Sequence, residues 1–309
     1  MYGPTLRAPV LRLARARWFR WLAIGTPVGR AVASRFVAGA LLDDAIAVAR
    51  SLEERRVGAI LDHLGENVVE PKQAADAANA YIRGLERIGS EPGLDCCISV
   101  KLTQLGLDFS NALCIAHLER VLGAAEQADA LVMIDMESSL YVDRTLAVFR
   151  DLRERHDGVG IALQSYLRRT AADVEALPAS SIVRMVKGAY LEPQELALPT
   201  RREVDRSFAQ LTATLLARGH TVHVATHDLA LIEGTKRHLA RTGVPWSRVE
   251  FQMLYGIRSD LQNELAGEGY PVRVYVPYGT EWYPYLTRRL AERPANMWFF
   301  MSNLLRSTR

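Results

Sequence analysis

The chain has 309 residues, of which 49% are hydrophobic and 24% are charged. This composition is typical of a globular protein and excludes wholesale disorder and fibrous repeats. The length allows two average domains, or one α/β barrel of roughly 250 residues with extensions. The net charge is +3, and nearly all basic residues are arginine, since the only lysines are Lys72, Lys101, Lys187 and Lys236. So few lysines make each one a candidate for a specific role.

The positive charge is concentrated at the start of the chain. No Asp or Glu precedes Asp43, whereas seven arginines do, so the first 42 residues carry +7 and the remainder 31 − 35 = −4. We predict a basic helical extension over residues 1–50, in which Leu11, Trp18 and Leu22 share one helical face. Such a helix could lie on a membrane surface or pack against the body of the protein. No run of about 18 apolar residues occurs, so we expect no membrane-spanning helix.

The three cysteines, Cys96, Cys97 and Cys114, are an odd number with no spacing typical of zinc ligands. Free thiols suit a reducing compartment. We therefore expect a cytoplasmic protein in which all three cysteines are small buried residues.

Eight short apolar or β-branched runs alternate with segments in which apolar residues recur at spacings of three and four. In chain order the predicted strands lie near Val57–Gly65, Cys97–Gln104, Leu131–Ser138, Val159–Tyr166, Ile182–Tyr190, Thr221–Asp228, Val249–Tyr255 and Val272–Gly279. The helical segments include Asn111–Gln127, Arg144–Arg155, Arg202–Arg218 and Leu229–Thr242. This alternation predicts a (β/α)8 barrel. A doubly wound sheet is less favoured, because neither G-x-G-x-x-G nor G-x-x-x-x-G-K-[ST] occurs.

Polar residues gather at the ends of the predicted strands, where a barrel carries its active site. They are Lys101 and Gln104, Asp135 and Glu137, Gln164, Arg184 and Lys187, His223 and His227, Gln252, and Tyr275 and Tyr278. An unpaired charge inside a strand is costly. The repetition from strand to strand therefore indicates the rim of an active site.

Two kinds of site are open for this rim. Lys101, Arg184, Lys187 and the Arg288–Arg289 pair could together bind an anion, since paired arginines suit bidentate recognition of a carboxylate or phosphate. Alternatively, Lys187 could be the desolvated Schiff-base lysine of a class I aldolase-type barrel.

Two further classes of site are less favoured. His220, His223 and His227 resemble a metal cluster, but only the last two share a strand face, so we predict no metal site. A basic nucleic-acid-binding module is the non-enzymatic alternative. The acidic remainder of the chain argues against it, and we expect no nucleic-acid partner.

Ordered motifs connect the chain to a known family. They include RMVKGAY (Arg184–Tyr190), ATHD (Ala225–Asp228), FQMLYG (Phe251–Gly256), and YVPYG (Tyr275–Gly279) followed by YLTRRLAE (Tyr285–Glu292). Upstream, SVKL ends at Leu102, IDME ends at Glu137 and LQS begins at Leu163. From about residue 59 to 296 the chain resembles proline dehydrogenase, and its length resembles that of the monofunctional bacterial enzymes.

The resemblance implies an FAD-binding, distorted (β/α)8 barrel over residues 51–309, with extra N-terminal helices and a C-terminal helix over the barrel mouth. It implies oxidation of L-proline to Δ1-pyrroline-5-carboxylate, by hydride transfer from substrate C5 to flavin N5. Electrons would pass to a membrane quinone, with peripheral contact at the inner face of the cell membrane. The reaction is the first step of proline catabolism to glutamate, and it implies a functional link to pyrroline-5-carboxylate dehydrogenase.

The resemblance also implies residue roles. Arg184 is expected near flavin N5, with Asp135 and Tyr275 as further catalytic residues. The proline carboxylate would be bound by Lys101, Arg288 and Arg289, with Glu292 orienting these cations. The proline ring would be enclosed by Leu254, Tyr275 and Tyr285. The remaining cofactor contacts are Met136, Gln164, Lys187, Gly188, Ala189, Thr226 and His227. Asp228 is left out of the predicted site, because some relatives carry Asn there.

Overall fold

A computed structural model describes residues 33–65 and 68–292, and for residues 288–292 it describes only the helical backbone. Most of the predicted basic extension therefore lies outside the described residues, as do the residues after position 292. No helix among the described residues is long and apolar enough to cross a membrane.

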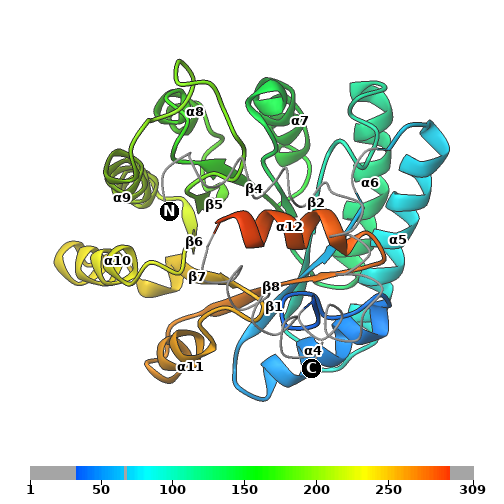
Figure 1. Ribbon diagram of the computed structural model, residues 1–309, viewed down its shortest axis with the longest axis horizontal. Helices are drawn as coiled ribbons and strands as arrows, with labels where there is room; N and C mark the ends of the chain where they lie inside the picture. Colours follow the sequence, from blue (N-terminus) through cyan, green and yellow to red (C-terminus); the bar gives the residue numbers. More distant parts are fainter. Residues whose placement is uncertain (1–32, 66–67, 293–309) are drawn as a thin grey trace, which may run out of the picture.

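Eight parallel strands close into a barrel in chain order, with β8 pairing back onto β1 (Figure 1). They are β1 (Gly58–His63), β2 (Cys96–Val100), β3 (Val132–Ile134), β4 (Val159–Gln164), β5 (Ile182–Val186), β6 (Thr221–Ala225), β7 (Val249–Leu254) and β8 (Val272–Tyr278). The predicted barrel and all eight predicted strands are confirmed. Each strand ends earlier than predicted, because its last residues leave the sheet to form the loops of the barrel mouth.

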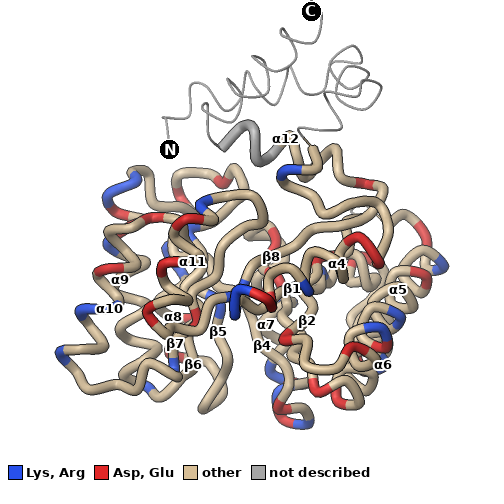
Figure 2. Tube along the Cα trace, turned by 90° about the horizontal axis from the view of Figure 1, so that it is seen from below, with Lys and Arg blue, Asp and Glu red and all other residues tan. Residues whose placement is uncertain are grey.

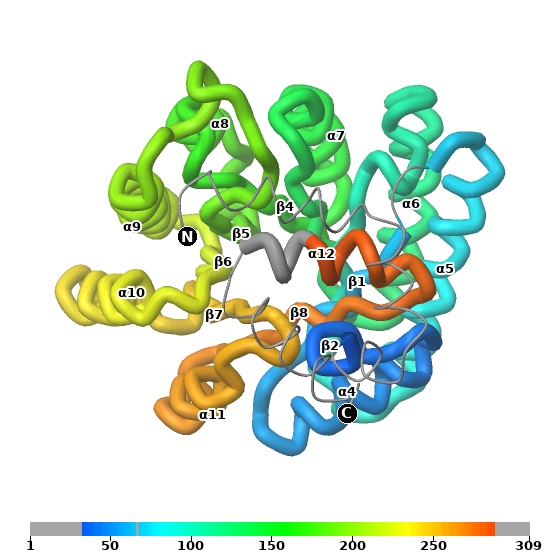
Figure 3. Tube along the Cα trace, viewed as in Figure 1, coloured from blue at the N-terminus to red at the C-terminus, as the bar shows by residue number. Residues whose placement is uncertain are grey.

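Helices surround the barrel (Figure 3). They are α4 (Leu42–Glu53), α5 (Pro71–Gly89), α6 (Asn111–Gln127), α7 (Val142–Arg153), α8 (Thr170–Glu175), α9 (Arg201–Ala217), α10 (Leu229–Thr242), α11 (Ser259–Gly267) and α12 (Trp282–Glu292), with short 3-10 turns η1 (Ser139–Tyr141) and η2 (Trp246–Arg248). Strand side chains alternate between two environments. On β5, Val183 and Met185 are fully buried in the apolar core, whereas Arg184 between them bonds to other strands across the barrel interior.

The last helix departs from the regular barrel, in which it would pack outside the sheet. Instead α12 lies over the C-terminal ends of the strands (Figures 1 and 2). The outer face of β1 and β8 is covered by α4, whose buried residues are Ala45, Ile46, Ala49 and Leu52. The predicted C-terminal helix over the barrel mouth is α12 (Figure 1), whereas the packing of α4 in its usual place was not predicted. Helix α4 runs across residue 50, and the division of the chain at that residue remains a prediction.

The cysteines are free and buried, as expected. Cys96 and Cys97 lie in β2, and Cys114 lies in α6. Burial raises the pKa of Cys97 to about 11, which keeps this thiol protonated and unreactive at neutral pH.

Candidate active site

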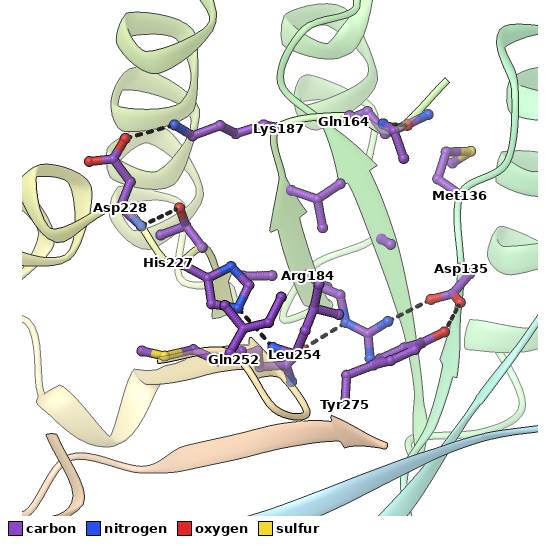
Figure 4. A pocket seen from close by; sticks show the side chains of 18 of the residues that line it. Asp135, Met136, Gln164, Arg184, Lys187, His227, Asp228, Gln252, Leu254 and Tyr275 are labelled. Carbon is purple, nitrogen blue, oxygen red and sulfur yellow. Dashed lines mark hydrogen bonds and ion pairs between the residues drawn. The ribbon is translucent and has the colours of Figure 1, made fainter. Parts of the chain in front are cut away.

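The mouth of the barrel holds a cavity of about 640 Å³, within the size range of small-molecule sites. Every predicted site residue whose side chain is described lines it: Lys101, Asp135, Met136, Gln164, Arg184, Lys187, Gly188, Ala189, Thr226, His227, Leu254, Tyr275 and Tyr285. Figure 4 labels several of them and shows Lys187 and Asp135 on different sides of Arg184. The side chains of Arg288, Arg289 and Glu292 lie outside the described residues. Their helix α12 places Tyr285 against the cavity.

Arg184 occupies the centre of the site. Its Nε donates to Gln252 Oε1 at 2.7 Å, and its Nη1 donates to Ser99 Oγ at 3.0 Å and Asp135 Oδ1 at 2.5 Å. The guanidinium also lies 5.4 Å from the centroid of the Tyr275 ring. The residue is 3% exposed, and its Nη2 has no hydrogen-bond partner among the described residues. The site therefore holds a buried cation with one donor that has no partner among these residues.

Asp135 organises the cations around it. Its Oδ1 accepts from Ser99 Oγ at 2.7 Å as well as from Arg184, and its Oδ2 accepts from the Tyr275 hydroxyl at 2.8 Å. Lys101 Nζ lies 3.7 Å from Oδ2. Burial raises the pKa of Tyr275 well above its usual value, and Asp135 adds to this effect. The phenol therefore stays neutral and donates to the carboxylate.

Lys101 has a second carboxylate partner that the sequence reasoning missed. Its Nζ donates to Asp62 Oδ1 at 2.8 Å, and Asp62 is 1% exposed. Burial alone would lower the pKa of Lys101, but Asp62, Tyr275 and Asp135 outweigh burial and the pKa rises. The ammonium is thus charged. The available signal was a lone acid, Asp62, that follows the apolar residues of strand β1.

Beneath Arg184, polar residues continue into the barrel. Gln252 Nε2 donates to Glu250 Oε1 at 2.6 Å and lies 2.8 Å from His223 Nδ1. Glu250 in turn pairs with Arg273 at 2.9 Å. We expected the polar strand residues to lie at the rim. The structure corrects this for Arg184, His223 and Gln252, which lie within their strands because alternating positions point into the barrel.

The three histidines do not form a cluster. His223 is buried inside the barrel, and burial lowers its pKa to about 4. His227 Nε2 accepts from the backbone N–H of Leu254 at 2.9 Å, and His220 Nδ1 accepts from that of Ser181 at 3.1 Å. Each ring has a separate structural contact, and the described part of the chain contains no group of three or more residues that could hold a metal ion.

The other end of the cavity is also charged. Lys187 Nζ lies 2.5 Å from Asp205 Oδ1 and 2.9 Å from Asp228 Oδ2, so this side chain has two carboxylate partners. This pairing argues against the Schiff-base alternative. Asp228 lines the cavity, although we had left it out of the site. Arg201, which also lines the cavity, was missed because its partner Asp228 is 27 residues away in the sequence.

The residue after Lys187 has to be glycine. Gly188 has φ +123°, and an added Cβ would lie 2.1 Å from the Tyr166 ring. We expect Gly188→Ala to displace the loop of Lys187 and Ala189 and to weaken cofactor retention at least about ten-fold, a loss equal to the roughly 1–3 kcal/mol of one strained backbone position. Release on dilution of FAD, the cofactor that the family resemblance implies, measures this. Gly267→Ala is the matched control, because nothing lies within 4 Å of its added Cβ. Equal retention in both variants would contradict a cofactor role for this loop.

The sequence of this chain is similar to those of known proteins. The family model of proline dehydrogenase matches residues 45–302. The chain belongs to the proline dehydrogenase family. It is 41% identical over 285 residues to proline dehydrogenase 1 of Bacillus subtilis subsp. natto, covering 92% of this chain and 93% of that protein. It is 38% identical over 281 residues to proline dehydrogenase of Deinococcus radiodurans, covering 89% of this chain and 90% of that protein.

Solved structures share the fold. The proline utilization A protein of Bdellovibrio bacteriovorus, inactivated by N-propargylglycine, superposes with a TM-score of 0.79 at 24% identity. That match covers 85% of this chain and 33% of the other, and it shows the shared fold alone. A Bradyrhizobium japonicum proline utilization A variant gives a TM-score of 0.66 at 27% identity, over 83% of this chain and 30% of that one. The predicted TIM-type fold and family resemblance are thereby confirmed.

Proposed function

We propose that this protein oxidises L-proline to Δ1-pyrroline-5-carboxylate with FAD as its cofactor. The observation that carries this proposal is Arg184, a buried arginine that lines the cavity and whose guanidinium is held by hydrogen bonds to Gln252 and Asp135. On one side lies the paired ammonium of Lys101, and on the other the charged group around Lys187. A long cofactor with an anionic part and a small anionic substrate together match this distribution of charge.

The residues of the cavity fit FAD. Gln164 has a fixed amide, since its Nε2 donates to the Glu137 carbonyl at 2.8 Å and its Oε1 accepts from the backbone N–H of Ala189 at 3.4 Å. Met136, Gln164 and Arg184 would hold the isoalloxazine. The phosphates and adenosine would be held by Lys187, Gly188, Ala189, Thr226 and His227. When bound there, FAD supplies the acceptor for hydride from proline C5.

Proline offers one carboxylate and one apolar ring. Lys101 would bind the carboxylate together with Arg288 and Arg289, a role for α12 that follows from its place over the mouth. Leu254, Tyr275 and Tyr285 would enclose the ring, and all three line the cavity. Fixing both parts of the substrate holds C5 in one position, which is the main requirement for hydride transfer.

The substrate nitrogen has to lose its proton before its lone pair can assist hydride loss. Lys101 and Arg184 are both charged cations at the site, and positive charge nearby favours the neutral amine over the ammonium. Asp135 accepts hydrogen bonds from Ser99, Arg184 and Tyr275, so its carboxylate is committed to orienting them. We propose that it positions these groups.

One experiment tests cofactor and substrate together. The purified protein should show the absorbance bands of oxidised flavin, and anaerobic L-proline should bleach them. D-Proline, which presents the same groups with the opposite hand, should bleach them far more slowly. A colourless protein that gains no flavin band on incubation with FAD would contradict the cofactor. A yellow protein that L-proline leaves oxidised would contradict the substrate.

We also propose that the electrons pass to a membrane quinone and that the product passes to pyrroline-5-carboxylate dehydrogenase. The seven arginines within the acid-free first 42 residues suit contact with anionic lipid. Co-sedimentation with anionic vesicles should fall when Arg7, Arg12 and Arg15 are replaced by Gln, and quinone reduction on those vesicles should fall with it. The result expected for neutral vesicles is weak sedimentation of both forms. Unchanged binding of the variant to anionic vesicles would contradict the membrane role.

A further inference from the structure

Four charged side chains form a group at one end of the cavity, on three separate elements. Lys187 follows β5, Arg201 and Asp205 lie on the first turns of α9, and Asp228 precedes α10. We call these four residues the charge quartet. Asp228 Oδ2 accepts from Lys187 Nζ and from Arg201 Nη2, each at 2.9 Å (Figure 4 shows the first contact). Asp205 pairs with Lys187 at 2.5 Å and with Arg201 at 3.4 Å.

The backbone that carries the quartet is fixed by local contacts. Asp228 is the N-cap of α10, because its Oδ1 accepts from the Ala230 N–H at 3.1 Å. Its own N–H donates to Thr226 Oγ1, also at 3.1 Å. Thr200 and Glu203 form a capping box at the start of α9. The charges are therefore held by helix ends that form independently of any ligand.

The quartet is electrically neutral, with two cations and two carboxylates. Hydrogen bonds from Lys187 and Arg201 outweigh the effect of burial and lower the pKa of Asp228 to about 2, so it is ionised at neutral pH. Lys187 is largely enclosed, whereas the Arg201 side chain is 56% exposed and borders the cavity. An anion that binds these cations has to approach two carboxylates that already neutralise them.

We propose that Arg201 binds the diphosphate of FAD together with Lys187, and that Asp228 is the counter-ion that competes with this diphosphate. The inference rests on the proposed cofactor of this cavity. Arg201 thereby has a role in binding the cofactor. Asp228 lines the same site but lowers its affinity for the cofactor. Both carboxylates of the quartet contact each cation, but Arg201 is the more exposed of the two and is therefore the more accessible to a diphosphate.

The direction in which one substitution changes the affinity for FAD tests whether Asp228 competes with the diphosphate. Asp228→Asn keeps the size and the N-cap, because Asn caps helices as well as Asp, but it removes the negative charge. We expect the FAD dissociation constant of the full chain to fall about three- to ten-fold at 50 mM NaCl, and the difference to shrink at 0.5 M NaCl through screening. Dilution of the FAD-loaded protein, with fluorescence of the released flavin, gives this constant. ADP, which carries the diphosphate without the flavin, should compete for binding more strongly in the variant.

Two comparisons complete the test. Arg201→Gln should raise the dissociation constant by a similar factor. Asp157→Asn removes the same charge at an exposed ion pair before β4, at the far end of the barrel, and should leave the constant unchanged. Asp205→Asn should lower the FAD dissociation constant, as Asp228→Asn should. It replaces Asp228→Asn in the test if that variant does not fold.

The outcomes separate this inference from the function it rests on. Weaker FAD binding by both Asp228→Asn and Asp205→Asn would show that the carboxylates orient the cations, and would overturn the competition. An unchanged constant in Arg201→Gln would overturn the binding role of Arg201. Failure of the unmodified protein to bind FAD at all would overturn the proposed function itself.

Discussion

Replacing Arg184 by methionine is expected to slow reduction of the bound flavin by L-proline about 100- to 1,000-fold, the usual cost of removing one charged donor aimed at developing charge. Arg184 is held by Gln252, Ser99 and Asp135, so its remaining donor is fixed before any ligand arrives. In the proposed reaction, this buried positive group would stabilise the negative charge that the cofactor gains. Methionine keeps much of the side-chain volume and loses both the charge and the hydrogen bonds.

Stopped-flow absorbance under anaerobic conditions measures this rate directly. The ratio of flavin to protein absorbance, taken first, separates lost chemistry from lost cofactor. Arg218→Met is the control, because Arg218 pairs with Glu175 on the outside of the barrel and touches no part of the cavity. If the Arg184 variant holds FAD and is reduced at the normal rate, Arg184 has no part in hydride transfer.

Lysine at position 184 gives a finer distinction. It retains the positive charge but cannot reproduce the two-sided contact in which Nε binds Gln252 and Nη1 binds Asp135. A rate between those of the unmodified and methionine proteins would indicate that charge and orientation both contribute. A rate equal to that of methionine would indicate that the planar geometry is essential.

The fold was predictable because its determinants are local. Each strand is a short apolar run, and the helices between strands have regular apolar spacing. On β5, Arg184 interrupts the run at a position that faces the barrel interior. Arg184 could be placed in the site from its motif, whereas its partner Gln252 comes from a strand 68 residues later. Which polar residues meet inside the barrel depends on the register between strands, and the local pattern does not contain that register.

Three features of the structure were not predictable for the same reason. Helix α4 replaces the last helix beside β8, which depends on how α12 packs over the mouth. Asp62 pairs with Lys101 across 39 residues, and Arg201 with Asp228 across 27. Each is a long-range contact between residues whose own neighbourhoods look ordinary. The motifs identified Lys101 and Lys187 as site residues. Their carboxylate partners are seen only in the closed barrel, where distant parts of the chain meet.

Replacing Lys101 by methionine is expected to damage both stability and proline binding, for two separable reasons. Asp62 would be left buried without its cation, and breaking a buried pair from one side costs about 3–5 kcal/mol of the free energy of unfolding. The converse variant, Asp62→Leu, should cost less, because Lys101 keeps Asp135 at 3.7 Å. Urea titration of the three proteins measures these differences.

The double variant Lys101→Met with Asp62→Leu separates the two effects. Removing both charges leaves no unpaired buried group, so most of the lost stability should return. Proline binding should not return, since the carboxylate has lost a buried charge-assisted donor worth about 1.5–3 kcal/mol, or roughly 10- to 100-fold in KM. A stable double variant with a normal KM for proline would show that Lys101 serves only to neutralise Asp62. A stable double variant with a raised KM would assign Lys101 to the substrate carboxylate, and Asp62 to keeping that lysine charged and in place.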